Sequence, residues 1–196
     1  MKVKNTTVYL LRHGAYENPK QVLHLRLPGF PLSPEGKKQA QALGKALASQ
    51  TITAIYASPL TRAQQTARAI ALHHNLPVMT DERIIDIRSP LQGMSLSELK
   101  KQGFHPYQHK FIQEGGERLS EVFSRIHKSI QEKVHMHRGQ KIVMVSHGDL
   151  IMSIVIKYRG GMLYSRNIFE RNYVGVGKGY VLEFSDRGRV AIASFP

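Results

Sequence analysis

Runs of apolar residues alternate with stretches of helical spacing along this chain. Four short apolar runs predict buried strands at Thr6–Leu11, Thr53–Ala57, Pro77–Thr80 and Lys141–Ser146. Apolar residues at helical spacing predict helices over residues 34–49, 59–71 and 119–134, and a further helix that ends at Ile156. A closing pair of strands is predicted at Tyr180–Phe184 and Val190–Ala193.

Turn and cap residues set the limits of these elements. Ser33-Pro34 and Ser58-Pro59 each predict a helix N-cap followed by proline at the first helical position. Gly139 predicts the end of the helix before it. Residues 15–31 are irregular and predict a long loop, and residues 81–116 predict a loop with one or two short helices.

Alternating strands and helices predict an α/β fold with a mostly parallel central sheet. We expect one domain over residues 1–196, with residues about 81–116 as a small cap-like insertion. In such folds, ligands bind beyond the carboxyl ends of the strands.

Composition narrows the classes of protein that this chain can belong to. Its 196 residues are 41% hydrophobic, which favours a globular protein over a disordered one. The absence of cysteine excludes disulfide scaffolds, thiolate zinc sites and cysteine nucleophiles. No apolar stretch approaches the roughly 20 residues of a membrane span, and Arg12 interrupts the first apolar run. We therefore expect a cytoplasmic protein without membrane association.

The chain is strongly basic, with 28 Lys and Arg against 14 Asp and Glu and a formal net charge of +14. Such a charge attracts nucleic acid, but the basic residues are dispersed and form no run longer than two. We therefore expect an anionic, phosphorylated small molecule as the partner rather than nucleic acid.

Three predicted strands end in residues that suit phosphoryl chemistry. These ends are Arg12-His13-Gly14, the stretch from Ser58 to Arg62, and Ser146-His147-Gly148. Because parallel strands end at the same edge of a sheet, we expect the two imidazoles and two guanidinium groups to meet in one pocket. Arginine binds phosphate oxygens in bidentate fashion, so this pocket matches a phosphoryl group.

A neutral imidazole is the available nucleophile, since the chain has no cysteine and no metal motif. His13 is the better candidate because Arg12 adjoins it and the long loop opens beside it. The leaving oxygen also needs a proton donor. Asp86 follows the third strand in apolar company, and Glu82 and Glu117 are its rivals.

We predict neither a metal nor a cofactor. Gly175-Val176-Gly177-Lys178-Gly179 looks like a phosphate-binding loop, but it precedes a strand and predicts a turn. The His73-His74 pair and the His135 and His137 pair have spacings that do not suit a shared metal ion. His105 and His109 have no evident third ligand.

The ordered set of motifs resembles the histidine phosphatase superfamily, also called the phosphoglycerate mutase-like family. The resemblance rests on Leu10-Leu11-Arg12-His13-Gly14, on residues 57–67, on Val145-Ser146-His147-Gly148 and on residues 31–40. It implies a three-layer sandwich with helices on both faces of the sheet. It also implies that His13 is phosphorylated, that Arg12, Arg62 and His147 hold the phosphoryl group, and that Asp86 is the acid.

The sequence departs from the family's usual pattern at several positions. Asp86 stands where the family commonly has glutamate, one methylene longer. Ala15-Tyr16 follows Arg-His-Gly, with Asn18 as a stand-in for a phosphate-contacting asparagine and Gly148 beside His147 as a further substrate contact. Ser89-Pro90-Leu91-Gln92-Gly93 replaces a segment that usually carries glycine and tryptophan.

The spacing of the site residues favours hydrolysis over phosphoryl transfer between hydroxyls. Only 147 − 86 = 61 positions separate Asp86 from His147, which is short for the closed lid that a mutase needs. We therefore predict a metal-independent phosphoric monoester hydrolase of the acid phosphatase type. The alternatives are a cofactor-dependent phosphoglycerate mutase-type enzyme and a non-catalytic protein that binds a phospho-ligand or nucleic acid.

Overall fold

A computed structural model describes residues 5–101, 103, 105–169 and 172–196. A six-stranded sheet in the order β3-β2-β4-β1-β5-β6 forms its centre. The strands are β1 (Thr6–Arg12), β2 (Ile52–Ala57), β3 (Val78–Thr80), β4 (Lys141–Ser146), β5 (Gly179–Phe184) and β6 (Val190–Phe195). Strands β1 to β4 are parallel, and β5 and β6 are antiparallel. The predicted mostly parallel α/β sheet is confirmed.

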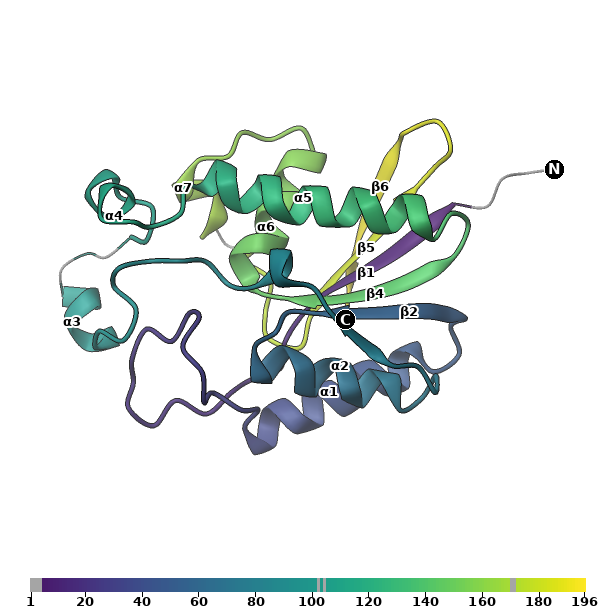
Figure 1. Ribbon diagram of the computed structural model, residues 1–196, viewed down its shortest axis with the longest axis horizontal. Coiled ribbons are helices and arrows are strands. Elements are labelled where there is room, and N and C mark those ends of the chain that lie inside the picture. The colour runs from purple at the N-terminus through teal and green to yellow at the C-terminus, as the bar shows by residue number, and fades with distance from the viewer. Residues whose placement is uncertain (1–4, 102, 104, 170–171) are drawn as a thin grey trace.

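Helices cover both faces of the sheet (Figure 1). On one face lie α1 (Pro34–Leu47) and α2 (Thr61–Ala71), and on the other lie α5 (Leu119–Met136) and α6 (Gly148–Tyr158). Side chains alternate along β1, so that Val8 and Leu10 join the core under α5 and α6, whereas Tyr9 and Leu11 join the core under α1 and α2. This packing holds the carboxyl ends of the parallel strands β1, β2 and β4 together at one edge of the sheet.

The segment between β3 and α5 lies beyond one end of the sheet, beside the loop of residues 15–31 (Figure 1). It contains the 3-10 turn η1 (Glu82–Ile84) and the helices α3 (Leu96–Lys101) and α4 (His109–Gln113). Backbone bonds join the two segments, because Leu96 N donates to Gln21 O and Leu23 N donates to Met94 O. One short helix, α7 (Ser165–Ile168), had no counterpart in the sequence pattern.

One of the two cap predictions is confirmed and the other is wrong. Ser33 caps α1 by accepting a hydrogen bond from Gly36 N, and Pro34 is the first helical residue. Helix α2 begins at Thr61, with Leu60 as an N-cap that makes no side-chain bond. The backbone of Leu60 is extended, so the helix begins only after it, and the Ser58 hydroxyl lies 2.8 Å from Nε2 of His147.

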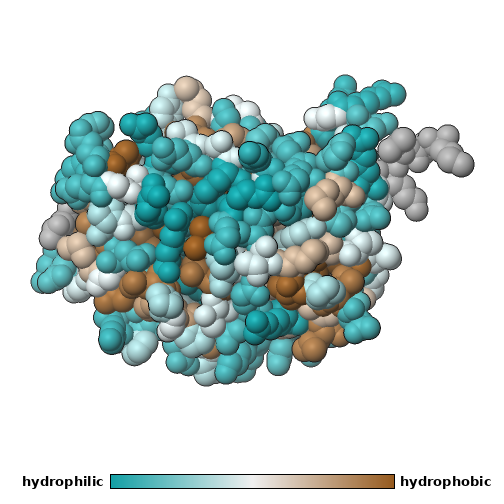
Figure 2. Space-filling model, viewed as in Figure 1, coloured by the Kyte–Doolittle hydropathy of each residue, from teal (hydrophilic) through white to brown (hydrophobic). Residues whose placement is uncertain are grey.

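Figure 2 shows polar side chains over most of the upper half of the view, where α5 lies in Figure 1. The opposite face of α5 is apolar and buries Leu119, Val122, Ile126 and Ile130. The predicted amphipathic helix is therefore confirmed. Within the described residues, every helix is too short or too polar to cross a bilayer.

Candidate active site

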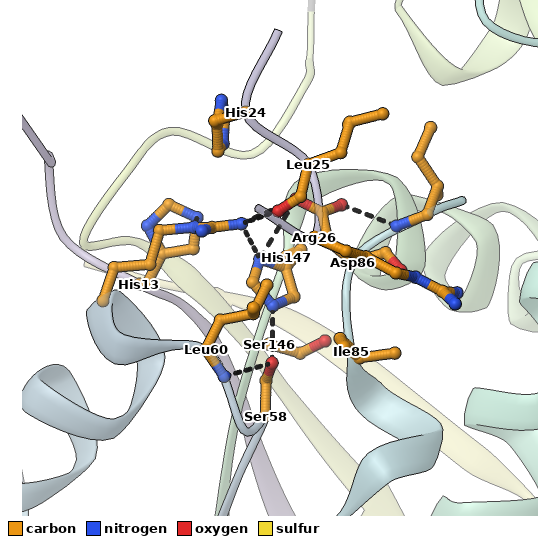
Figure 3. A network of polar contacts seen from close by, with 12 residues as sticks. His13, His24, Leu25, Arg26, Ser58, Leu60, Ile85, Asp86, Ser146 and His147 are labelled. Atoms are coloured by element: carbon orange, nitrogen blue, oxygen red, sulfur yellow. Dashed lines mark hydrogen bonds and ion pairs between the residues drawn. The ribbon is translucent and has the colours of Figure 1, made fainter. Parts of the chain in front are cut away.

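Three strand ends bring His13, Arg62 and His147 into one buried cluster. Strand β1 pairs with β4 so that Arg12 lies opposite Ser146, and His13 and His147 follow these two residues. The two imidazole rings lie 5.1 Å apart (Figure 3). Arg62, in the first turn of α2, reaches both of them: its Nε lies 3.2 Å from His13 Nε2, and its Nη2 lies 3.3 Å from His147 Nδ1.

His13 is held as a neutral imidazole with one unprotonated nitrogen, which accepts a hydrogen bond from Arg62 Nε. Its Nδ1 donates to the carbonyl oxygen of Gly14 at 2.8 Å, which leaves the lone pair on Nε2. The ring is only 2% exposed. Burial holds the pKa of His13 well below 6.5, and the nearby His147 and Arg62 lower it further. The unprotonated nitrogen faces the Arg62 guanidinium.

His147 lies between Ser58 and Asp86 (Figure 3). Its Nε2 is 2.8 Å from Ser58 Oγ, and its Nδ1 is 3.4 Å from Asp86 Oδ2. Burial holds the pKa of His147 well below its usual value, and the charge of Arg62 adds to this effect. His147 is also the N-cap residue of α6, so it stands at the positive end of that helix.

Arg62 ties the cluster together although it is only 1% exposed. Its Nη2 donates to Leu25 O at 2.8 Å and to Asp86 Oδ2 at 2.9 Å. The ring of Tyr16 covers the guanidinium at 5.5 Å. The guanidinium therefore connects both imidazoles and the carboxylate.

Hydrogen bonds to the carboxylate and to the carbonyl oxygen of Asp86 direct this residue at the cluster. Its Oδ1 accepts from Ile87 N at 2.9 Å, and its Oδ2 pairs with Arg62. Its carbonyl oxygen accepts from Arg26 Nε at 2.7 Å and from Arg125 Nη2 at 3.1 Å. These bonds hold the segment on which Asp86 stands.

The two rival carboxylates are placed differently. Glu117 is buried, and its oxygens accept from Arg26, Arg125 and the backbone N–H of Arg88, each at 2.8 Å. Glu82 is exposed on η1. Asp86 is thus the one of the three that contacts Arg62 and His147.

A pocket of about 410 Å³ opens over the cluster. Arg12, His13, Asp86, His147 and Gly148 line it, whereas the buried Arg62 is not among its lining residues. The remaining lining residues are mostly apolar or aromatic: Leu23, His24, Leu25, Ile87, His105, Pro106, Asp149, Phe169 and Tyr173. Arg12 donates from Nη1 to Val174 O at 2.7 Å, and within the described residues its buried Nε has no partner. A buried N–H without a partner suits an anionic ligand.

The predicted substrate contacts fare unequally. Asn18 does not line this pocket, because both ends of its amide bond the backbone of Val22 within its own loop. Gly148 lines the pocket, but a Cβ there would clash with the Tyr173 hydroxyl. Sequence reasoning missed the bonds of Asp149 and Arg125, whose partners come from distant segments. Across the part of the chain that the structure describes, no group of three or more His, Asp or Glu is arranged to hold a metal ion.

Comparisons with known proteins place this geometry in a family. Residues 8–192 match the profile of the Histidine phosphatase superfamily (branch 1). The chain belongs to the histidine phosphatase superfamily. It is 35% identical over 82% of its length to the uncharacterized protein Rv0525 of Mycobacterium tuberculosis, of which the match covers 82%. It is 36% identical over 70% of its length to phosphoserine phosphatase 1 of Hydrogenobacter thermophilus, covering 69% of that protein.

The fold of this histidine phosphatase superfamily member also matches solved structures. YhfR of Bacillus stearothermophilus superposes with a TM-score of 0.82 at 24% identity, with 96% of each chain covered. That likeness confirms the fold expected from the sequence motifs, a sheet with helices on both faces as in the phosphoglycerate mutase-like proteins.

Proposed function

We propose that this protein hydrolyses phosphomonoesters through a phosphohistidine formed on His13. In the first step, Nε2 of His13 attacks phosphorus, the ester P–O bond breaks, and Asp86 gives its proton to the leaving oxygen. In the second step, water attacks phosphorus while Asp86 takes a proton from it. The P–N bond then breaks, which releases inorganic phosphate and restores the neutral imidazole.

The observation that carries this proposal is the state of the His13 ring. Its Nδ1 proton is used by the Gly14 carbonyl, so the lone pair on Nε2 points at the Arg62 guanidinium, where a phosphoryl group would bind. A cation beside the nucleophile binds the phosphoryl oxygens and so holds phosphorus close to the attacking nitrogen. The same cation stabilises the negative charge of the transition state.

The position of Asp86 supports its role as proton donor. In the free protein its Oδ2 is an ion-pair partner of Arg62 at 2.9 Å. A phosphate dianion that binds Arg62 replaces this partner and lies beside the carboxylate. In this position the carboxyl group lies within reach of the leaving oxygen, as a general acid must.

One relative supports hydrolysis as the reaction, whereas others are named probable phosphoglycerate mutases. A relative with 36% identity is named a phosphoserine phosphatase. Arg12 adds a buried Nε–H that has no partner within the described residues, and this group is available to a phosphate oxygen. No metal ion takes part in either proposed step.

Release of phosphate from 4-nitrophenyl phosphate tests the proposal. The wild-type protein is expected to turn over, and His13→Ala is expected to lose at least a thousandfold in kcat/KM because the nucleophile is gone. The exposed His73 provides the control variant His73→Ala, which should retain activity. A labelled phosphoryl group should stay on the wild-type chain after quenching in alkali, where phosphohistidine survives.

Three outcomes would overturn parts of this proposal. Activity that survives His13→Ala contradicts the nucleophile, and activity unchanged in Asp86→Asn contradicts the acid. Isomerisation of phosphoglycerate, dependent on a bisphosphorylated primer and faster than phosphate release, would indicate mutase-type transfer. Binding of phosphate without any turnover would indicate a non-catalytic binding protein.

A further inference from the structure

The carboxylate of Asp149 is buried next to the active site and takes no part in the proposed mechanism. It follows His147-Gly148 directly and lines the same pocket. Its Oδ1 accepts from the Tyr173 hydroxyl at 2.6 Å, and its Oδ2 accepts from the Tyr107 hydroxyl at 2.7 Å. Two short bonds to separate oxygens are a specific arrangement for one carboxylate.

The three residues come from three separate segments. Asp149 stands in the first turn of α6, where the helix dipole favours a negative charge. Tyr107 belongs to the segment between α3 and α4, and Tyr173 belongs to the segment between α7 and β5. The carboxylate therefore joins the α3–α4 segment and the α7–β5 segment to the start of α6, next to His147.

Tyr173 extends this link to Arg12. The guanidinium of Arg12 lies 5.2 Å from the centre of the Tyr173 ring, and its Nη1 donates to the carbonyl oxygen of the next residue, Val174. On its other side, Tyr173 packs against Gly148 so closely that a Cβ on that glycine would overlap the hydroxyl. Tyr173 thus contacts both the first residue of α6 and the last residue of β1.

The charges of the group are consistent with this arrangement. Burial and the charge of Asp86 raise the pKa of Asp149, whereas the two tyrosine hydrogen bonds and the charge of Arg12 act in the opposite direction. Burial and the adjacent Asp149 raise the pKa of Tyr107 and of Tyr173, so both hydroxyls remain donors. An acceptor of two O–H groups and a cation on the far side of one ring suit an ionised carboxylate.

We propose that Asp149 is a positioning residue that acts through two hydrogen bonds. Through Tyr173 it fixes Arg12 for the phosphoryl group. Through Tyr107 it fixes the pocket wall formed by His105 and Pro106, which we assign to the leaving group. This inference rests on the proposed function, because it assigns Arg12 to the phosphoryl group.

Removal of one hydroxyl at a time separates the effects of the two hydrogen bonds. Tyr173→Phe keeps the ring under Arg12 but breaks the bond to Asp149. The inhibition constants of orthovanadate and inorganic phosphate should rise about tenfold, the scale of one lost bond to a charged group. The kcat/KM should fall by the same factor for methyl phosphate and for naphthyl phosphate, because both share the phosphoryl group.

Tyr107→Phe should give the opposite pattern. The vanadate and phosphate inhibition constants should stay within about twofold of wild type, while the Michaelis constant for naphthyl phosphate rises several-fold relative to that for methyl phosphate. Tyr158→Phe is the matched control. It removes a hydroxyl at the end of α6 opposite to Asp149, where that hydroxyl bonds His127 of α5. It should change none of these constants.

Coupling through Asp149 is tested in a double-mutant cycle. In an Asp149→Asn background, Tyr173→Phe should add less than about twofold, since the bond that it breaks is already altered. The single tyrosine variants keep the proposal testable if Asp149→Asn does not fold.

Two results would overturn the inference. The first is a vanadate inhibition constant that Tyr173→Phe leaves unchanged. The second is that both tyrosine variants change every constant by the same factor and also lower the melting temperature, which would indicate a purely structural role. A wild-type protein that binds neither anion would overturn the proposed function and this inference with it. Loss of activity in His13→Ala together with unchanged constants in Tyr173→Phe would overturn the inference alone.

Discussion

At the scale of single residues, the proposed role of His13 as nucleophile depends on its protonation state rather than on its position alone. Its Nδ1 proton is fixed by the Gly14 carbonyl, and the ring is surrounded by Arg62, Arg12 and His147. Burial and these neighbours all disfavour the imidazolium form. The hydrogen bond to Gly14 favours this form, but it does not reverse the direction of the pKa shift.

A titration of His13 provides the first prediction. Because its pKa is lowered, the ring should remain neutral as the pH falls from 8 through 6.5, where an ordinary histidine is half protonated. In Arg62→Gln a nearby positive charge is lost, so the midpoint should move upward. NMR of labelled histidine rings measures both midpoints. A wild-type His13 that titrates between pH 6 and 7 would contradict the prediction.

At the scale of elements, α1 approaches the loop after His13 at a glycine. A Cβ on Gly36 would overlap the backbone of Ala15, and a Cβ on Gly14 would press on the carbonyl of Gly36. Ser33 N donates to Ala15 O across the same contact. The close approach holds the backbone next to His13, the proposed nucleophile, against the first turn of the helix.

Gly36→Ala should therefore separate α1 from the His13 loop. We expect unfolding to become easier by about 2–4 kcal/mol, because backbone atoms cannot move aside as side chains do. The kcat/KM of this variant should also fall, because the loop after His13 is displaced. Gly175→Ala is the matched control, since a Cβ there meets only the side chain of Lys178 at an ordinary distance. Denaturant unfolding of both variants measures the difference, and equal midpoints would refute the argument.

A second contact between elements positions Asp86, the proposed acid. Arg125 of α5 donates to the carbonyl oxygens of Arg83, Ile85 and Asp86 and to the carboxylate of Glu117. One planar guanidinium thus fixes the turn between η1 and Asp86. Lysine keeps the charge but has no fork of donors to replace these bonds.

Arg125→Lys should lower kcat about tenfold while the inhibition constant of phosphate stays within about twofold, because Asp86 loses its alignment but the anion-binding groups remain. Steady-state kinetics with 4-nitrophenyl phosphate measure the split. Arg138→Lys, on the exposed turn after α5, is the control. A variant that loses stability but keeps the wild-type kcat would show that Arg125 has only a structural role.

The sequence allowed prediction of those features that depend on local pattern. Strand β4 was predicted with its observed bounds, because the apolar run from Ile142 to Val145 has polar residues on both sides. The start of α2 was missed by two residues, because the pattern of Ser58-Pro59 does not reveal that His147 engages the serine hydroxyl. The role of Asp149 was out of reach, since its tyrosines lie 42 and 24 positions away.

At the scale of the whole molecule, the active site makes the fold sensitive to acid. Three histidines at the pocket have lowered pKa values: His13 and His147 lie well below 6.5, and burial lowers the pKa of His24 to about 4. The +14 formal charge adds repulsion to every further proton. Because these imidazoles are buried in the neutral form beside arginines, the free energy of unfolding should depend on pH through the residues of the candidate site.

The sign of this dependence follows from proton binding. Between the lowered pKa in the folded state and 6.5 in the unfolded state, the unfolded chain binds more protons, so the free energy of unfolding decreases as the pH falls. Each of the three histidines should contribute about 1 kcal/mol of lost stability between pH 7.5 and 5.5. Carboxylates titrate mostly below this window, which separates their effect from that of the histidines.

Urea unfolding at pH 7.5, 6.5 and 5.5, in buffers without phosphate, measures this loss, and His24→Gln provides the internal comparison. This variant removes one neutral imidazole whose ring packs on Tyr16 and Phe30, so it should be less stable at pH 7.5 but should lose about 1 kcal/mol less on acidification. A pH dependence identical to that of the wild type would show that His24 is protonated to the same extent in both states. A wild-type stability that does not change over this range would contradict burial of all three rings in the neutral form.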